Sequence, residues 1–115
     1  MSEQHTYRVI VRGTWDALTD EARQRLLAGA GGHGMSSMRF TEEGSLSYEP
    51  SPLKHFSMRY VVVCDAEDGE EMAAAIAEDR AETTLRGLGY SFCGLRSTVT
   101  DMNTMKVNVK RASRR

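Results

Sequence analysis

The chain has 115 residues, of which 40% are hydrophobic and 27% charged, and its formal net charge at pH 7 is −1. This length suits one domain that buries a core without disulfides or metal, so we expect a single domain over residues 1–115 with a disordered basic tail from about residue 111. The near-neutral charge gives no global sign of nucleic-acid binding, and no apolar stretch approaches the roughly 20 residues of a membrane helix. We therefore predict a cytoplasmic protein with neither nucleic acid nor membrane as partner.

The first expected strand covers residues 6–12, TYRVIVR, where apolar and polar side chains alternate. A helix is expected next, because Thr19 is a good N-cap, acidic residues follow it, and Ala22 and Leu26 lie four positions apart. The glycine-rich run 29–34 comes after this helix rather than before one. It is therefore typical of a helix end and not of a phosphate-binding loop.

Two short alternating segments, 36–41 and 45–49, stay in phase across an acidic turn, and they form either one bent strand or a small hairpin. Two prolines between 50 and 52 then break the chain. The stretch 55–64, HFSMRYVVVC, is the longest apolar run and alternates throughout. We predict that it is a central strand of a sheet.

The most strongly helical segment covers residues 65–89, which open with acids and close at Gly87 and Gly89. Its expected apolar stripe consists of Met72, Ala73, Ile76, Ala77, Thr84 and Leu88. Residues 91–100 alternate again as a strand, and residues 105–109 suit a short fifth strand or an extended tail.

The order strand, helix, strand, strand, helix, strand predicts an α+β protein with the ferredoxin-like βαββαβ plan. In this plan an antiparallel sheet carries both helices on one face, and the other face starts uncovered. The alternation then gathers five arginines on the open face: Arg8, Arg12, Arg39, Arg59 and Arg96. Guanidinium groups bind carboxylate, phosphate and phenolate, so this face is a candidate site for an anionic ligand.

The arginine face has two other interpretations, of which pairing with acidic residues stays open and RNA binding is disfavoured. The arginines could instead pair with Glu49 and other acids, on a solvated face or across a dimer interface. An RNA-binding surface is disfavoured, because only Phe92 offers an aromatic ring for base stacking on that face.

Three stretches carry a family resemblance: YRVIVRGTWDALTDEARQRLL, FSMRYVV and GLGYSFCGLRSTVTDMNTMKV, with Thr100-Asp101-Met102 and Thr104 as the most recognisable piece. Through them nearly the whole chain resembles a family of short actinobacterial proteins known as a domain of unknown function. The fold is also similar to that of dimeric α/β-barrel enzymes, which include cofactor-free monooxygenases and polyketide cyclases. The resemblance implies bacterial secondary metabolism and no particular catalytic residue.

The chemistry-bearing residues favour neither covalent nor zinc catalysis, because no serine–histidine–acid or Cys–His spacing is present. We expect no metal and no cofactor, with Cys64 and Cys93 both reduced and in or near the core. His55 and Asp101 are the candidate catalytic residues, although an exposed histidine and a turn-forming aspartate are simpler interpretations. The candidate ligand-binding residues are Arg8, Arg12, Arg59, Arg96, Trp15 and Tyr60.

The arginine face favours a small-molecule enzyme that acts on an aromatic or anionic substrate, and the resemblance implies polyketide-type cyclisation, isomerisation or cofactor-free oxidation as its reaction. The alternative is a non-catalytic small-molecule-binding or structural dimer protein. We expect a homodimer, because Ile10, Val61 and Val63 lie between arginines on the open face.

Overall fold

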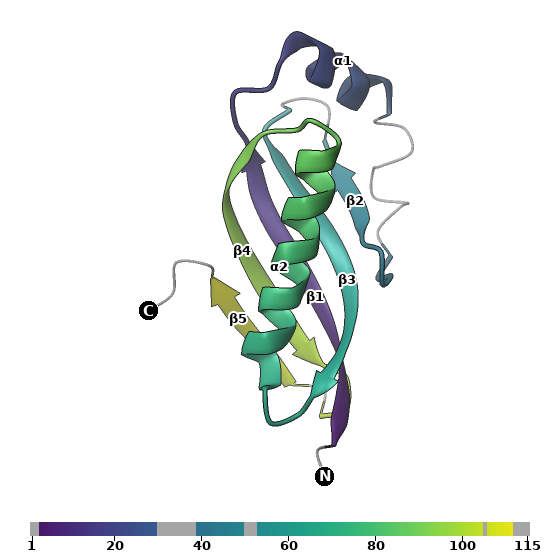
Figure 1. Ribbon diagram of the computed structural model, residues 1–115, viewed down its shortest axis with the longest axis vertical. Coiled ribbons are helices and arrows are strands. Elements are labelled where there is room, and N and C mark those ends of the chain that lie inside the picture. The colour runs from purple at the N-terminus through teal and green to yellow at the C-terminus, as the bar shows by residue number, and fades with distance from the viewer. Residues whose placement is uncertain (1–2, 30–38, 50–52, 105, 112–115) are drawn as a thin grey trace.

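The computed structural model describes residues 3–29, 39–49 and 53–104 and the backbone of residues 106–111. It contains seven elements in the order β1 (Gln4–Trp15), α1 (Asp20–Ala28), β2 (Ser45–Tyr48), β3 (His55–Asp65), α2 (Gly69–Gly87), β4 (Phe92–Asp101) and β5 (Lys106–Arg111). The predicted α+β class, with an antiparallel sheet and two helices, is confirmed (Figure 1).

The sheet has five strands in the order β2-β3-β1-β4-β5, and every neighbouring pair runs antiparallel. Its middle strand is β1, which pairs with β3 from Gln4 to Thr14 and with β4 from Tyr7 to Trp15. The predicted central strand 55–64 is β3, which is interior and lies between β2 and β1. The fifth strand, expected as strand or tail, is β5; residues 112–115 of the predicted tail lie outside the described residues.

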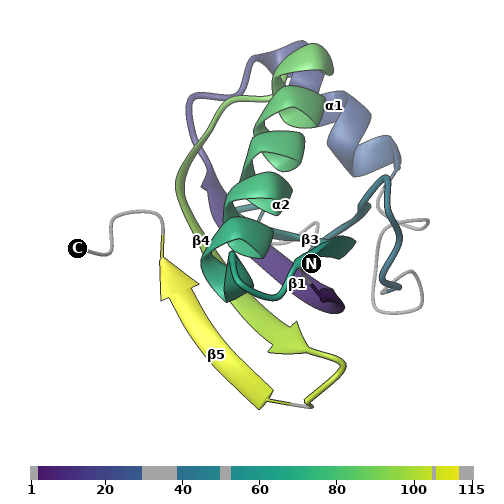
Figure 2. The same cartoon turned by 60° about the horizontal axis from the view of Figure 1, so that its bottom comes forward.

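The core lies between the sheet and the helices. Alternate residues Tyr7, Val9 and Val11 of β1 are almost fully buried, as period-two burial under a helical layer requires. The long helix α2 lies across this face, and α1 lies at the end of the sheet where α2 ends (Figures 1 and 2). Leu26 of α1 joins the same core cluster, so both helices contribute to one covered face.

Helix α1 begins where the sequence predicts. The Thr19 hydroxyl accepts a hydrogen bond from the Ala22 backbone N–H at 3.0 Å, and thereby satisfies one of the free donors of the first turn. At the other end, the Tyr48 hydroxyl of β2 donates to the Leu26 carbonyl. This hydrogen bond ties the short helix to the edge of the sheet.

The predicted apolar stripe of α2 is partly wrong. The buried residues of this helix are Ala73, Ala74, Ala77, Ala81 and Leu85, whereas Met72 is 40% exposed and Leu88 is 47% exposed. Small alanine side chains let the helix approach the sheet closely, so the contact line follows alanines at four-residue spacing rather than the largest side chains. The helix face is therefore rotated relative to the prediction.

The prediction that both cysteines lie in or near the core is wrong for Cys93, which is exposed, while Cys64 is buried. The alternation of β4 breaks because its register against β1 shifts between Arg12 and Thr14, and because Gly94 has φ 66°. Beyond this irregularity the expected alternation returns, and Ser97 and Val99 are buried.

The segments 36–41 and 45–49 form neither one long strand nor a hairpin over their described part. Strand β2 covers only Ser45–Tyr48, and Thr41 makes a separate parallel bridge to Tyr60 of β3. Residues 36–38 lie outside the described residues.

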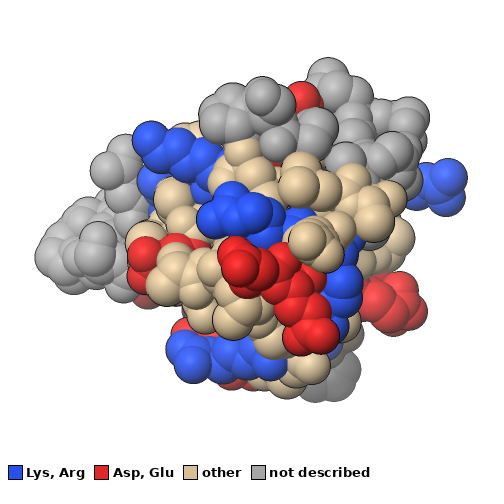
Figure 3. Space-filling view, turned by 90° about the horizontal axis from the view of Figure 1, so that it is seen from above, with Lys and Arg blue, Asp and Glu red and all other residues tan. Residues whose placement is uncertain are grey.

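Charge is mixed on the surface. Seen from above, basic and acidic patches lie side by side over the described part of the molecule, and neither sign dominates (Figure 3). Neither described helix is long and apolar enough to cross a bilayer.

Candidate functional site

The sheet face opposite α2, which we call the open face, carries four of the five arginines expected there, whereas Arg39 lies outside the strands. On β1, Arg8 and Arg12 alternate with buried valines, and the register places Arg12 opposite both Ser57 of β3 and Arg96 of β4. Arg59 of β3 lies opposite Ile10 on the same face. The alternation of the strands thus brings four arginines onto one surface.

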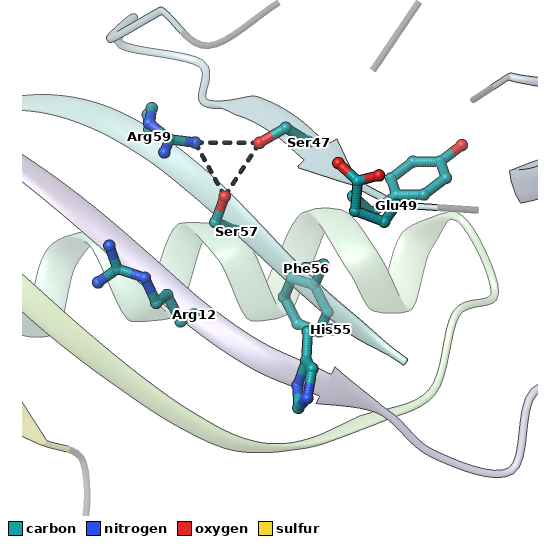
Figure 4. Close-up of a pocket in the computed structure, with 8 residues that line it drawn as sticks. Arg12, Ser47, Glu49, His55, Phe56, Ser57 and Arg59 are labelled. Carbon is teal, nitrogen blue, oxygen red and sulfur yellow. Dashed lines mark hydrogen bonds between the residues drawn. The ribbon is translucent and has the colours of Figure 1, made fainter. Parts of the chain in front are cut away.

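Part of this surface is hollowed into a cavity of about 340 Å³, which we call the open-face pocket. Its lining comes from β1, β3 and the edge strand β2: Arg12, Ser47, Tyr48, Glu49, His55, Phe56, Ser57 and Arg59 (Figure 4). Pockets of small-molecule sites commonly have volumes of about 300–1,000 Å³, so this one suits a compact ligand.

The most constrained polar group of the pocket is the Arg59 guanidinium. Its Nη1 donates to the Ser57 hydroxyl at 2.8 Å and to the Ser47 hydroxyl at 3.0 Å, and the two hydroxyl oxygens lie 3.0 Å apart (Figure 4). Burial, with the positive charge of Arg12, lowers the pKa of Arg59 from its usual value. The hydrogen bonds thus hold the Arg59 guanidinium in a fixed place. An anion beside it would favour its charged form and so offset the effects of burial and of Arg12 on its pKa.

The second guanidinium belongs to Arg12, which is exposed and donates to the Thr98 hydroxyl at 3.1 Å. Among the described residues, ion pairs join His5 to Glu3 and Asp101, and Arg86 to Glu82; none involves an open-face arginine. The predicted alternative of pairing with Glu49 is therefore not observed in the described part of the chain. Two positive charges and the Glu49 carboxylate therefore line one pocket, and within the described residues neither arginine forms an ion pair with Glu49.

Two of the predicted ligand-binding arginines lie outside the open-face pocket. Arg8 stacks on Phe40, with its Cζ 5.1 Å from the ring centroid, and Arg96 does not line the cavity. They make useful controls, because they share the face and the exposure of Arg12.

His55 lies at the rim of the open-face pocket, at the start of β3. The side chain is exposed, and its Nδ1 lies 3.3 Å from the Thr14 hydroxyl oxygen. An imidazole at this rim is available both to donate and to accept a hydrogen bond with a ligand in the pocket.

Asp101, the other candidate catalytic residue, is not near His55. Asp101 pairs with Tyr7 in the sheet, whereas His55 pairs with Thr14 at the opposite end of β1. The side chain of Asp101 is buried on the covered face. There its Oδ2 accepts a hydrogen bond from His5 Nδ1 at 2.9 Å. Sequence reasoning missed His5, which appears in no motif and meets Asp101 only through the sheet.

The electrostatics of the His5–Asp101 pair favour both charges. The hydrogen bond to Asp101 raises the pKa of His5, against burial, and Glu3 adds to the effect. Burial alone would raise the pKa of Asp101, but hydrogen bonds from His5 and from the backbone N–H groups of Asn103 and Thr104 outweigh it, so this pKa is lowered. The pair ties the first strand to the end of β4.

The predicted aromatic ligands Trp15 and Tyr60 lie on the covered side. Tyr60 is fully buried, and Trp15 packs against Phe56 with ring centroids 4.4 Å apart and edge-on to Tyr48 at 6.1 Å. Because Phe56 and Tyr48 line the open-face pocket, the single tryptophan of the chain lies one ring behind that pocket. Trp15 itself does not line the pocket, but its emission is expected to respond to a ligand there.

The hydroxyl-bearing pocket residues that the sequence did not single out are Ser47 and Ser57. Their alternation with buried residues indicated the open face, but only the β2–β3 register, which places Ser47 opposite Ser57, brings them to Arg59. Over the described residues, no group of three or more histidine, cysteine or acidic side chains is arranged to hold a metal ion.

Comparisons with known proteins place the chain in a family without transferring an activity. Neither the curated proteins nor the solved structures gave a significant match. Residues 1–113 match the family of unknown function DUF6204. Since this match covers nearly the whole sequence, the chain belongs to the family DUF6204.

Proposed function

We propose that the protein binds a small organic anion in the open-face pocket and that His55 exchanges a proton with it. The observation that carries this proposal is the pair of guanidinium groups, Arg12 and Arg59, which line one cavity of about 340 Å³. Glu49 lines the same cavity, but within the described residues neither arginine forms an ion pair with it. A carboxylate or phenolate satisfies such a pair better than water does, because charged hydrogen bonds strengthen where solvent is partly excluded.

The same arrangement suits chemistry at carbon next to a carbonyl group. Cyclisation and isomerisation of such compounds begin when a base removes a proton from that carbon and leaves an enolate. His55 is the base in this proposal, and the guanidinium groups of Arg12 and Arg59 stabilise the enolate oxygen. The narrower form of the proposal is an enzyme of bacterial secondary metabolism with an aromatic, polyketide-type substrate.

We also propose that the fold is ferredoxin-like and that the protein is a homodimer. The order β2-β3-β1-β4 supports the first point, because β1 and β2 are parallel across β3, β3 and β4 are parallel across β1, and β5 is an addition at the edge. The proposal of a homodimer rests on Val63, which is 52% exposed on the open face beside Val61. Sedimentation at micromolar concentration tests it, and a monomer would refute it.

Binding is tested with salicylate, an aromatic acid, and with the uncharged benzyl alcohol, by calorimetry and by the emission of Trp15. Arg59→Met should weaken salicylate binding about thirtyfold, since a lost charged contact in a desolvated site costs on the order of 2 kcal/mol or more. Arg12→Met should weaken it less, because Arg12 is more exposed than Arg59. Arg8→Met is the matched control and should bind as the parent does.

Proton transfer is tested with phenylpyruvate, an aromatic keto acid, by following its keto–enol interconversion. His55→Gln should lower the catalysed rate by about 100-fold or more and leave salicylate affinity unchanged. Salicylate binding without acceleration of this reaction would favour the non-catalytic alternative, a small-molecule-binding protein. Equal salicylate affinity in the Arg59→Met, Arg8→Met and parent proteins would refute the site itself.

A further inference from the structure

A second cavity, of about 310 Å³, lies on the other side of the sheet, between α1, α2 and the strands β2 and β3. We call it the inter-helix pocket. Its apolar lining is Leu26, Leu46, Met58, Leu85, Leu88 and Tyr90. None of the residues proposed to bind or react with a ligand in the open-face pocket lines it, although Tyr48 contributes to the walls of both cavities.

The floor and the mouth of the inter-helix pocket differ in character. Leu26, Met58 and Leu85 at the floor are at most 3% exposed and belong to the core, whereas Leu88, in the loop after α2, is 47% exposed. An apolar passage therefore leads from the surface toward the core. A hydrophobic body that enters it would remove the exposed leucine from water.

Among the described residues that line this pocket, Arg25 is the one with a positive charge. Arg25, in the last turn of α1, donates from Nη2 to the Leu88 carbonyl at 3.1 Å, and its Cζ lies 5.4 Å from the centre of the Tyr90 ring. It forms no ion pair within the described residues. The guanidinium is thus oriented by two neighbours and keeps further N–H donors for an anion.

We propose that the inter-helix pocket binds an amphipathic organic anion, with its apolar body among the leucines and its carboxylate on Arg25. The volume is at the lower end of the usual range of roughly 300–1,000 Å³, so the body is a medium-length acyl chain or a small fused ring rather than a large polycycle. The inter-helix pocket and the open-face pocket have different charged residues, so the two sites can be tested separately although Tyr48 lines both.

The test uses octanoate for the acyl chain, 2-naphthoate for the ring, and 1-octanol as the uncharged counterpart, all measured by calorimetry. The titrations use the Arg59→Met protein, whose open-face pocket is weakened, so that saturable binding of one anion per chain is expected and reports the inter-helix pocket. The anion that binds more tightly shows whether the apolar part is an acyl chain or a ring. Thr84→Phe places a ring at the pocket wall and should weaken that anion at least about tenfold. Thr83→Phe, an exposed neighbour on the same helix that does not line the pocket, is the matched control and should bind as the parent does.

The charge is tested separately from the shape. Arg25→Met should weaken octanoate about tenfold and leave 1-octanol unchanged, and Arg23→Met on the same helix should change neither. This comparison still decides the matter if Thr84→Phe fails to fold, which near-ultraviolet circular dichroism would reveal. The proposal is overturned if neither anion binds saturably, if folded Thr84→Phe binds like Thr83→Phe, or if Arg25→Met weakens octanol as much as octanoate. Arg59→Met should weaken salicylate and still bind one octanoate at the inter-helix pocket, whereas Arg25→Met should weaken octanoate there and leave salicylate unchanged. Failure of one site is therefore distinguishable from failure of the other.

Discussion

Gly13 of β1 offers a sharp test of the packing behind the open-face pocket. It lies opposite Phe56 in the sheet, and a Cβ atom added to it would lie 2.5 Å from Cζ of that ring and 2.9 Å from Cδ2 of Leu95. The Phe56 ring cannot simply turn away, because it is buried and packs against Trp15 at 4.4 Å between centroids. Gly13→Ala should therefore force a shift of side chain or backbone, and such overpacking costs about 1–3 kcal/mol.

Thermal unfolding gives the measurement. In a domain of this size, each kcal/mol lowers the Tm by about 4 °C, so Gly13→Ala should melt about 4–12 °C below the parent. The control is Gly87→Ala in α2, where an added Cβ meets nothing within 4 Å and alanine gains helix propensity. Its Tm should equal or slightly exceed that of the parent. A Gly13→Ala protein that melts with the parent would refute the close approach to Phe56.

The two remaining predictions concern titratable side chains. Because the pKa of His5 is raised from 6.5 and that of Asp101 lowered from 3.8, their pairing should stabilise the fold most between these values and progressively less as pH rises above 6.5 or falls below 3.8. In urea unfolding, the free energy of unfolding of Asp101→Asn should thus fall below that of the parent by the largest amount near pH 5 and by less toward pH 9. A difference that stays constant with pH would contradict the pairing. Of the two thiols, the exposed Cys93 should react at once with a disulfide reagent, whereas the buried Cys64 should react only on unfolding. Burial raises the pKa of Cys64, and the negative charge of Asp68 raises it further. Equal reaction rates of the two thiols in the folded protein would contradict the burial of Cys64.

The sheet could be predicted from the sequence because its strands bury alternate residues under one helical layer. Residues 6–12 and 55–64 show this alternation clearly, and in the structure they lie within β1 and β3. Helix α1 was also predictable, since its start depends on a local hydrogen bond from Ala22 to Thr19. Where local periodicity and local capping decide the structure, the sequence is sufficient.

The parts of the fold and of the candidate site that the sequence did not predict depend on features other than periodicity. The exposure of Cys93 follows from a register shift opposite it, and the buried line of α2 follows from how closely alanines let the helix approach. For the candidate site, the open face of the arginines was predictable, but the contact of Arg59 with Ser47 depends on a cross-strand register. Likewise, the pairing of His5 with Asp101 joins residues that no spacing rule connects.

The central place of β1 has a consequence for how the chain folds. One edge of this first strand is completed by β3, but the other waits for β4, and the His5–Asp101 contact closes a separation of 96 positions. Contacts so distant in sequence require large loops to close before any pairing energy is gained, which places such folds among the slower single domains. On a ribosome, the hydrogen-bonding groups along that edge of β1 stay unpaired until nearly the whole chain has emerged.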